Sequence, residues 1–444
     1  MNYMKKAATV FCLSVVVTAA AQGQSYTLDD CIEYAISHNI NVQKRALDIS
    51  QQEIALNTSK NAWLPSINLD MSQMFGFNNP GAASGNSSVS LADDGSATIG
   101  TIGASMPLFD GFKIKNQAKA DKFSLMSATA DLEAAKKDIS IQVAAYYLQC
   151  LYHKGMADVS RKQVETSREM VRRAAILVEE GKRPRSEQAD AEAQLALDEH
   201  TLTDDEGRYT LSLLTLAHAL NMPDIEGFRI VDDEQALGLS PDAAFQTPEA
   251  IYKSTVDSWP SIMSAQAGIR QSESLLMVRK ADYYPQISLT GSMGTAYYNM
   301  FHQGGLGSFG HQLHSNFGEI IGLSLSYPIF NRYQTRNRVK KASNEVLYQR
   351  LDLENAKLRL REDIQNAYYN ATVAQKKHQS SVKACEASRI SVEYEEIRYE
   401  EGRSSIFDLL QARQKFHKAQ QDAIQAKYES MIRQKILEFY YSQK

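Results

Sequence analysis

The amino-acid sequence repeats itself once, and this duplication constrains the fold more than any other feature. Four short motifs recur in the same order at an offset of 220 to 222 residues, which chance does not readily produce. We therefore expect two copies of one structural unit, over 22–220 and 248–444, joined by a linker or equatorial segment at 221–247. The paired motifs are Trp63–Leu69 with Tyr283–Leu289, Pro107–Asp110 with Pro328–Asn331, Ala145–Tyr147 with Ala367–Tyr369, and Glu179–Gly181 with Glu400–Gly402.

Each copy is expected to open with a helix and a strand hairpin. The helices, over 28–62 and 248–282, end shortly before a proline, because proline disrupts a helix interior and favours an extended residue before it. Apolar and polar residues then alternate, which predicts strands with one apolar face. The hairpins are expected over 66–107 and 286–328, each with a loop rich in Gly, Ser and Asn.

A long helical segment follows each strand hairpin. Residues 111–180 and 333–401 contain no proline, and helix-favouring residues such as Ala, Glu, Lys and Leu dominate both. About 70 residues at about 1.5 Å each would form a rod roughly 100 Å long. Apolar residues are sparse, so such a rod must pack against partner rods. Each rod ends at a Glu-Glu-Gly turn, near 181 or 402, after which a second helix returns.

The number of strands predicts an oligomer. Two hairpins supply four amphipathic strands, whereas a closed membrane barrel needs about eight, and an open sheet edge is not tolerated in lipid. Strands from several chains must then share one barrel, and both two and three chains would give an even number of strands. The expected fold class is mostly α with a small β part, in which a long α-helical coiled-coil barrel is continued by a shared transmembrane β-barrel.

The N-terminus and the composition narrow the class of protein. Residues 1–21 are typical of an export signal, with Lys5 and Lys6 before an apolar run at 7–17 and three alanines at 19–21. No later stretch of about 18 apolar residues predicts a transmembrane helix. Removal of the two lysines changes the formal net charge from −4 to −6, which disfavours nucleic acid as a partner. Three cysteines remain without a CxxC pair, so no disulfide framework is expected.

In its order of strand and helix hairpins the chain resembles the TolC-like outer-membrane efflux proteins. The shared motifs are Pro-Leu-Phe-Asp-Gly at 107–111, Ala-Tyr-Tyr in both copies, and Glu-Glu-Gly-x-x-Ser-x-x-Asp-Leu-Leu-x-Ala at 400–412. The resemblance implies a homotrimer with one barrel in outer-membrane lipid and a large periplasmic tunnel of helices. It also implies a passive exit duct of an efflux or type I secretion system. The partners would be a periplasmic adaptor (membrane fusion) protein and an inner-membrane RND or ABC transporter.

The resemblance assigns functional roles to the turns of the two helix hairpins. In the family, an adaptor docks on the turn that follows the rod, and an ordinary solvated turn is the alternative. The corresponding residues in this chain are Gly181, Lys182 and Arg183 in the first copy and Gly402, Arg403 and Ser404 in the second.

The resemblance also implies a gate that narrows the periplasmic mouth. Acidic residues lie six and nine positions past the turn glycine in the family. Here these positions hold Glu187 and Asp190 in the first copy, and Asp408 and Gln411 in the second. Tyr399 takes the place of the gate aromatic, whereas Ser404 replaces the arginine that locks it and Arg403 is the substitute expected. The alternative for Glu187 and Asp408 is that each only complements a helix dipole.

Two motifs resemble binding signatures in an unsuitable context. Gly305–Gly310 matches GxGxxG but lies within an expected strand hairpin, not between a strand and a helix. His302, His311 and His314 share that loop without an interleaved carboxylate, which disfavours a metal site. No HExxH, GxSxG or catalytic Cys/His spacing occurs, so neither an enzyme nor a cofactor is expected.

Two other functions compete with the exit duct. One is a periplasmic coiled-coil scaffold without a pore, which fractionation would place in the soluble periplasm. The other is a surface enzyme on a small barrel, which requires a catalytic constellation that the sequence does not contain.

Overall fold

The computed structural model describes residues 25–77, 95–222, 227–231, 244–301 and 307–441. The expected export signal at 1–21, most of the first strand loop, much of the linker, and His302 with the start of the GxGxxG match lie outside the described residues. Contacts within the chain separate two compact units. Unit 1 comprises 1–44, 132–257 and 358–444, and unit 2 comprises 45–131 and 258–357.

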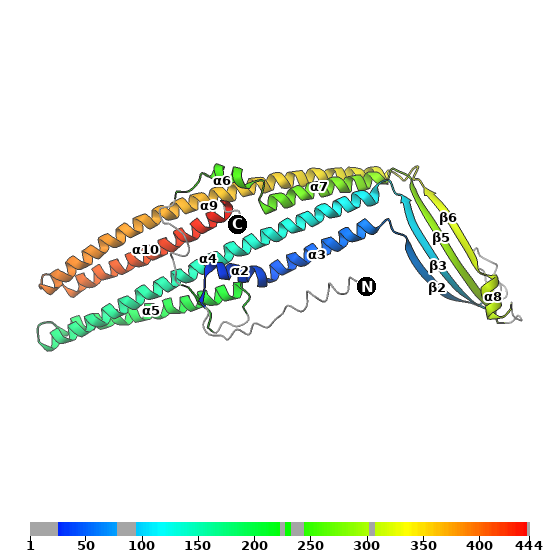
Figure 1. The fold of residues 1–444 in the computed structure, drawn as a ribbon. Coiled ribbons are helices and arrows are strands. Elements are labelled where there is room, and N and C mark those ends of the chain that lie inside the picture. The colour runs from blue at the N-terminus through cyan, green and yellow to red at the C-terminus, as the bar shows by residue number, and fades with distance from the viewer. Residues whose placement is uncertain (1–24, 78–94, 223–226, 232–243, 302–306, 442–444) are drawn as a thin grey trace. The chain divides into compact units, whose positions relative to one another are not determined.

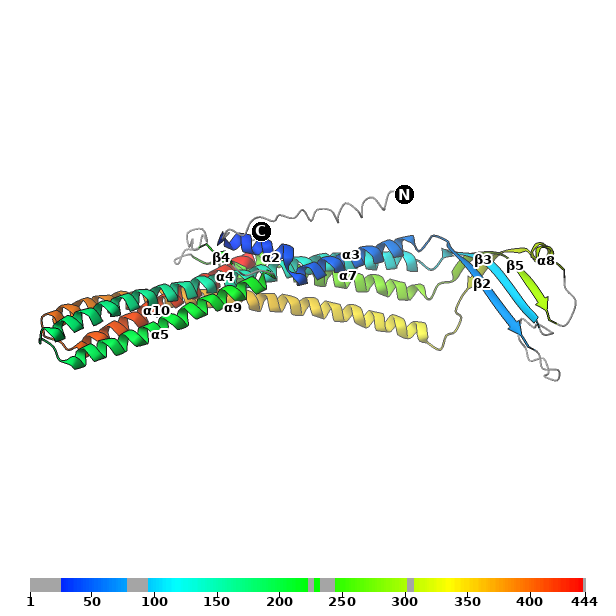
Figure 2. The same cartoon turned by 90° about the horizontal axis from the view of Figure 1, so that it is seen from below.

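Two helical hairpins make up most of unit 1, and the first part of the longer helix of each belongs to unit 2. α4 (Lys113–Glu179) precedes α5 (Arg185–Ala219), and α9 (Gln334–Glu400) precedes α10 (Ile406–Tyr441). In both views each returning helix lies along its partner, and the two turns lie at the same end of the unit (Figures 1 and 2). α4 and α9 have 67 residues each, as the absence of proline over both segments predicts. Each rod is thus one long helix followed by a shorter returning helix.

The apolar core of unit 1 joins α2 (Leu28–His38) to α4, α5 and α10. Leu148 of α4 and Leu216 of α5 are fully buried in it. A short parallel sheet of β1 (Ser25–Tyr26) and β4 (Arg229–Ile230) lies beside this core, where the Tyr147 hydroxyl donates to the Val231 carbonyl over 2.7 Å. The described part of the expected linker thus supplies a strand to unit 1.

The helix expected at the start of each copy is divided in two. In the first copy α2 ends before Asn39, and α3 covers Ile40–Asn61. The Asn39 side chain accepts hydrogen bonds from the backbone amides of Asn41 and Val42. It therefore caps a new helix instead of continuing the previous one. In the second copy α6 (Pro248–Thr255) and α7 (Pro260–Ala281) are separate, because Pro260 opens a helix at its first position.

Unit 2 contains a four-stranded antiparallel sheet in the order β2-β3-β5-β6. The strands are β2 (Ser66–Gly76), β3 (Gly95–Phe109), β5 (Gln286–Met300) and β6 (Gly318–Ser326). β3 pairs with β5, so the hairpins of the two copies form one sheet. The expected second strand loop also contains a short helix, α8 (Phe309–Ser315), whose Gln312 side chain bonds the Tyr298 backbone.

The outer strands of this sheet expose their apolar side chains. Ile67 and Leu69 on β2 are 69% and 67% exposed, and Ile321 and Leu323 on β6 are 84% and 69% exposed. Such a surface requires lipid or another chain to cover it. Among the described residues, no helix combines the length and the apolar character needed to cross a membrane.

Buried acidic residues join α4 to α5 in the first copy. Ser160 donates to Asp205 over 2.6 Å and Ser167 donates to Asp198 over 2.5 Å, and both aspartates are 7% exposed. An offset of 221 places Ala426 and Ala419 at the aspartate positions of the second copy. The corresponding serines, Ser381 and Ser388, donate to carbonyls of their own helix. The two hairpins therefore share a backbone design but differ in their interior chemistry.

Replacing Asp198 with alanine should lower the free energy of unfolding by about 1–3 kcal/mol, because buried donors would lose their acceptor. Gln163 and Gln194 also donate to this carboxylate, so three side chains are affected. Denaturant unfolding followed by circular dichroism measures the change. Asp204→Ala, which removes an exposed carboxylate paired with Arg208, is the matched control. Equal effects of the two substitutions would contradict a stabilising role for the buried contacts.

Candidate functional site

The two hairpin turns in unit 1 have the same backbone geometry. Each helix ends at a glycine in the left-handed region, with φ +71° at Gly181 and +73° at Gly402. The amide after each glycine donates back to a carbonyl five residues earlier, from Lys182 to Leu177 over 2.9 Å and from Arg403 to Arg398 over 2.8 Å. This is the Schellman arrangement, in which glycine avoids the steric cost of a side chain. The Glu-Glu-Gly motif thus fixes both turns.

A cluster of polar contacts connects the two turns. The Tyr399 hydroxyl donates to the Glu187 carboxylate over 3.0 Å. The Arg183 guanidinium forms an ion pair with the same carboxylate at 3.3 Å and lies 4.9 Å from the centre of the Tyr399 ring. Arg183 also donates to the Tyr399 backbone carbonyl over 3.4 Å. We call Arg183, Glu187 and Tyr399 the tip latch, because they join the first hairpin to the second.

The tip latch is partly shielded from water. The side chains of Arg183 and Glu187 are 24% and 13% exposed. Burial raises the pKa of Tyr399, and its hydrogen bond to Glu187 raises that pKa further, although the nearby Arg183 opposes the shift. The phenol therefore stays protonated at neutral pH and remains a donor to the carboxylate.

Asp408 has a different environment from Glu187, although the two occupy equivalent positions in the repeat. Its carboxylate accepts from the Ser405 hydroxyl over 2.7 Å and from the Ser405 amide over 3.3 Å, and the Asp408 amide donates back to Ser405 over 3.2 Å. These reciprocal bonds form a capping box at the start of α10. The bonds from Ser405, first the side chain and then the backbone, lower the pKa of Asp408. Within one chain, Asp408 thus stabilises its own helix, whereas Glu187 bonds to the other hairpin.

The remaining residues expected at the tips are exposed or locally paired. Lys182 and Arg403 each pair with an acidic residue two positions earlier, Glu180 at 2.6 Å and Glu401 at 3.2 Å. Ser404 donates to Glu395, and Asp190 is exposed. Phe407, which the sequence analysis did not single out, is 70% exposed in the first turn of α10.

The structure identifies a different partner for Tyr399 from the one expected. Arg403 was the expected substitute for the missing arginine, but its guanidinium pairs with Glu401. Arg183 instead contacts Tyr399 from the other copy. Sequence order gave no direct sign of this contact, because the two residues are 216 positions apart. The only sign of it in the sequence was that the two turns differ, with Arg183 in the first copy at the position equivalent to Ser404 in the second.

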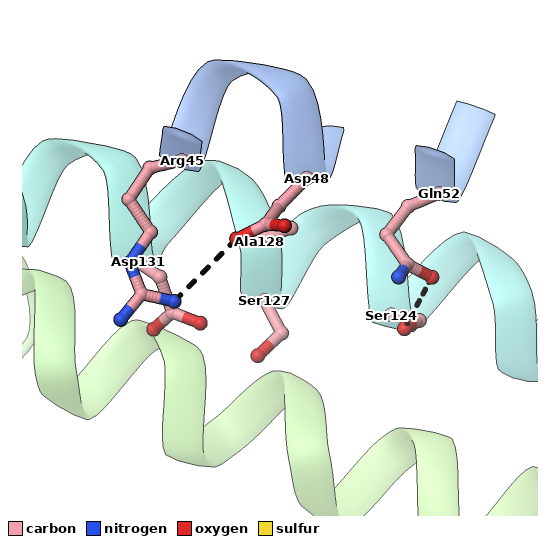
Figure 3. Close-up of a pocket in the computed structure, with 7 residues that line it drawn as sticks. All are labelled: Arg45, Asp48, Gln52, Ser124, Ser127, Ala128 and Asp131. Carbon is pink, nitrogen blue, oxygen red and sulfur yellow. Dashed lines mark hydrogen bonds and ion pairs between the residues drawn. The ribbon is translucent and has the colours of Figure 1, made fainter. Parts of the chain in front are cut away.

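A polar pocket of about 190 Å³ lies in unit 2 between α3 and α4. Figure 3 shows Arg45 reaching toward Asp48 and Asp131, and Gln52 bonded to Ser124. The Arg45–Asp48 ion pair measures 3.6 Å and the Gln52–Ser124 hydrogen bond 2.9 Å. The ion pair lies within α3, whereas the Gln52–Ser124 bond joins α3 to α4. Across the described parts of the chain, no group of three or more His, Cys, Asp or Glu side chains is arranged to hold a metal ion.

Comparison with protein families gives one matching model, described as outer membrane efflux protein. It matches the chain twice, over residues 31–222 and 251–440. The two matched ranges confirm the internal duplication. A curated relative, the outer membrane efflux protein BepC of Brucella suis biovar 1 (strain 1330), is 20% identical over 341 residues, covering 76% of this chain and 70% of its own.

Solved structures share the fold. The Campylobacter jejuni CmeC outer membrane channel has a TM-score of 0.76 at 17% identity, over 93% of this chain and 85% of that one. A membrane protein from Pseudomonas aeruginosa has a TM-score of 0.77 at 14% identity, over 94% and 90%. The expected fold class, mostly helical with a small sheet, is therefore confirmed.

The capping role of Asp408 predicts a pH dependence at the start of α10. Because its pKa is lowered in the fold, its stabilising effect is complete above the ordinary value of 3.8 and is lost as pH falls through the lower folded value. At neutral pH, Asp408→Ala should therefore decrease the hydrogen-exchange protection of residues 405–409. The difference from the unmodified chain should disappear once the pH is well below 3.8.

Asp422→Ala is the control for this experiment, because Asp422 is an exposed acid in the interior of the same helix. It should leave the protection of residues 405–409 unchanged. A difference between Asp408→Ala and the unmodified chain that persists at low pH would contradict the capping-box account.

Proposed function

Because the chain belongs to the outer membrane efflux protein family, we propose that three copies form the passive exit duct of a multicomponent efflux or type I secretion system. The protein resides in the outer membrane and has a large periplasmic part. The observation that carries the proposal is the tip latch, in which Tyr399 of one hairpin bonds to Glu187 of the other. A gated duct needs a reversible bond between its two long hairpins, whereas a permanent scaffold has no use for one.

In the proposed duct the sheets of three chains close into one wall. The unpaired outer sides of β2 and β6 would pair between neighbouring copies, which removes the open edges that lipid does not tolerate. The apolar faces of these strands would then contact lipid. A scaffold dissolved in the periplasm would leave them uncovered, so this feature favours the duct.

The proposed gate lies at the hairpin turns. A threefold arrangement would bring together three copies each of Glu187, Asp190 and Asp408, and such carboxylate rings favour cations. Their different environments support different roles in the proposed gate. Glu187 is part of the tip latch, Asp190 is exposed to form a ring, and Asp408 first caps α10.

The proposed adaptor surface consists of the exposed residues of the two turns. Lys182 and Arg403 present similar charges at equivalent positions, and Gly181 and Gly402 hold the backbone that displays them. Ser404 differs from its counterpart Arg183, and Phe407 adds an exposed aromatic side chain to the second turn. A periplasmic adaptor would bind here, and an inner-membrane RND or ABC transporter would supply the energy.

Breaking the tip latch should favour the open duct. Tyr399→Phe removes one hydrogen bond, worth about 1 kcal/mol net, and should shift the closed-to-open equilibrium about fivefold toward the open state. Purified protein in planar lipid bilayers should show small cation-preferring currents that increase in this variant. Arg183→Gln should act in the same direction, because it removes an ion pair to the same carboxylate.

Tyr394→Phe is the matched control, since Tyr394 lies on the same helix and is 67% exposed. Its conductance should equal that of the unmodified protein. An unmodified protein that never conducts would refute the duct. Conducting protein whose current is insensitive to Tyr399→Phe would refute the tip latch as its gate.

A further inference from the structure

Charge changes abruptly where unit 2 passes from sheet to helix. The four strands contain only two charged residues, Asp70 and Glu319. Immediately after β6, residues 332–341 contain five basic residues and no acidic one. They are Arg332, Arg336, Arg338, Lys340 and Lys341, and all five are exposed. The basic segment begins within six residues of the last strand residue, Ser326.

Exposed aromatic and apolar residues follow the strand and reach into the start of the basic segment. Tyr327, Phe330 and Tyr333 are 57%, 73% and 60% exposed, and Ile329 is 92% exposed. Exposed aromatic rings next to apolar strands mark the level of the lipid headgroups in outer-membrane proteins. Since this protein resides in the outer membrane, the basic segment begins where the chain leaves the lipid on its periplasmic side.

Arg332 has an unfavourable backbone conformation for its residue type. Its φ is +54° and that of Tyr333 is +62°, both in the left-handed region. The equivalent residues of the first copy, Gly111 and Phe112, both have φ +68°. Glycine adopts this region readily, whereas a residue with a Cβ atom adopts it at a cost. At this turn, the second copy therefore carries an arginine where the first copy has the residue that suits the backbone.

The two arginines nearest the turn are available to an anion. The Arg336 guanidinium lies 5.9 Å from the Tyr333 ring centre, which keeps it close to the turn. Arg338 and Lys113 both approach Asp282, at 3.9 and 3.4 Å, and are partly neutralised. No acidic side chain in the described ranges forms an ion pair with Arg332 or Arg336. The first two amides of α9 are already occupied, because Gln334 donates to the Asn331 carbonyl over 3.1 Å and Thr335 donates to the Asn331 side chain over 3.4 Å. The two guanidinium groups are therefore the donors available to an anion at this turn.

We propose that Arg332 and Arg336 bind the phosphate of a glycerophospholipid in the periplasmic leaflet. Guanidinium groups bind phosphate through paired N–H donors, and lysines at 340 and 341 extend the positive surface. The adjacent aromatic residues favour a lipid over free phosphate, because they place the arginines at headgroup depth. The site depends on the membrane location of the protein and not on whether the duct opens.

The experiment compares lipid retention by the full chain and two variants. Protein is reconstituted in nanodiscs of phosphatidylethanolamine and phosphatidylglycerol, extracted into mild detergent, and analysed by native mass spectrometry. Arg332→Gly and Arg336→Gln should each bind phosphatidylglycerol about tenfold more weakly, as the loss of a charge-assisted hydrogen bond predicts. The double variant Lys383→Gln/Lys415→Gln, which removes two exposed charges from unit 1, should retain lipid as the unmodified chain does.

Arg332→Gly also separates binding from folding. It installs the residue that suits the left-handed backbone, so its thermal unfolding midpoint should stay the same or rise while lipid retention falls. Undiminished retention in this variant would overturn the proposal, as would an equal loss in the lysine control. Displacement of the lipid by millimolar inorganic phosphate, with equal binding of phosphate to delipidated protein, would identify a free-anion site and also overturn it. Lipid retention is measured without a conducting pore. The lipid proposal can therefore be tested even if the duct hypothesis fails.

Discussion

The unpaired edges of the four-stranded sheet are the constraint on which the rest of the structure depends. β2 and β6 each have one neighbour within the chain, and both expose rows of apolar side chains. Backbone groups at an open edge invite pairing with another chain. The edges of such a sheet are paired only when several copies of the chain share it. Assembly is therefore required by the backbone hydrogen bonding of the sheet itself. The duplication reduces the number of open edges per chain, since the two copies join through β3 and β5 into one continuous sheet.

The two copies keep their backbone geometry and diverge in side-chain chemistry. Both rods end in a left-handed glycine, and both sheet-to-helix turns use two consecutive left-handed residues. The side chains differ at three pairs of equivalent positions. Asp198 is equivalent to Ala419 in the second copy, Arg183 to Ser404, and Gly111 to Arg332. Duplication thus left the fold-determining positions alike and freed the others to take separate roles.

The sequence predicted those parts of the fold that depend on local patterns. Alternation over 286–297 predicts a strand, and a proline-free segment ending at Glu-Glu-Gly predicts a rod, because both signals lie within the element itself. The division of the first helix was missed because it depends on whether one side chain, that of Asn39, turns back to cap the next helix. The contact of Arg183 with Tyr399 was missed for a different reason. It joins residues from separate hairpins, and no pattern along the chain encodes which side chains meet across them.

In the proposed duct, the composition of the tip latch means that a small energy would suffice to open the hairpin turns. Each contact is a partly shielded hydrogen bond or ion pair, worth on the order of 1 kcal/mol, whereas the helices are held by a core that includes Leu148 and Leu216. Opening the turns can therefore break the tip latch without disturbing that core. Burial and Glu187 both raise the pKa of Tyr399, so the phenol stays protonated and remains a donor at neutral pH. In the proposed duct, opening would then be controlled by a partner that competes for Glu187 and Arg183 at the turns.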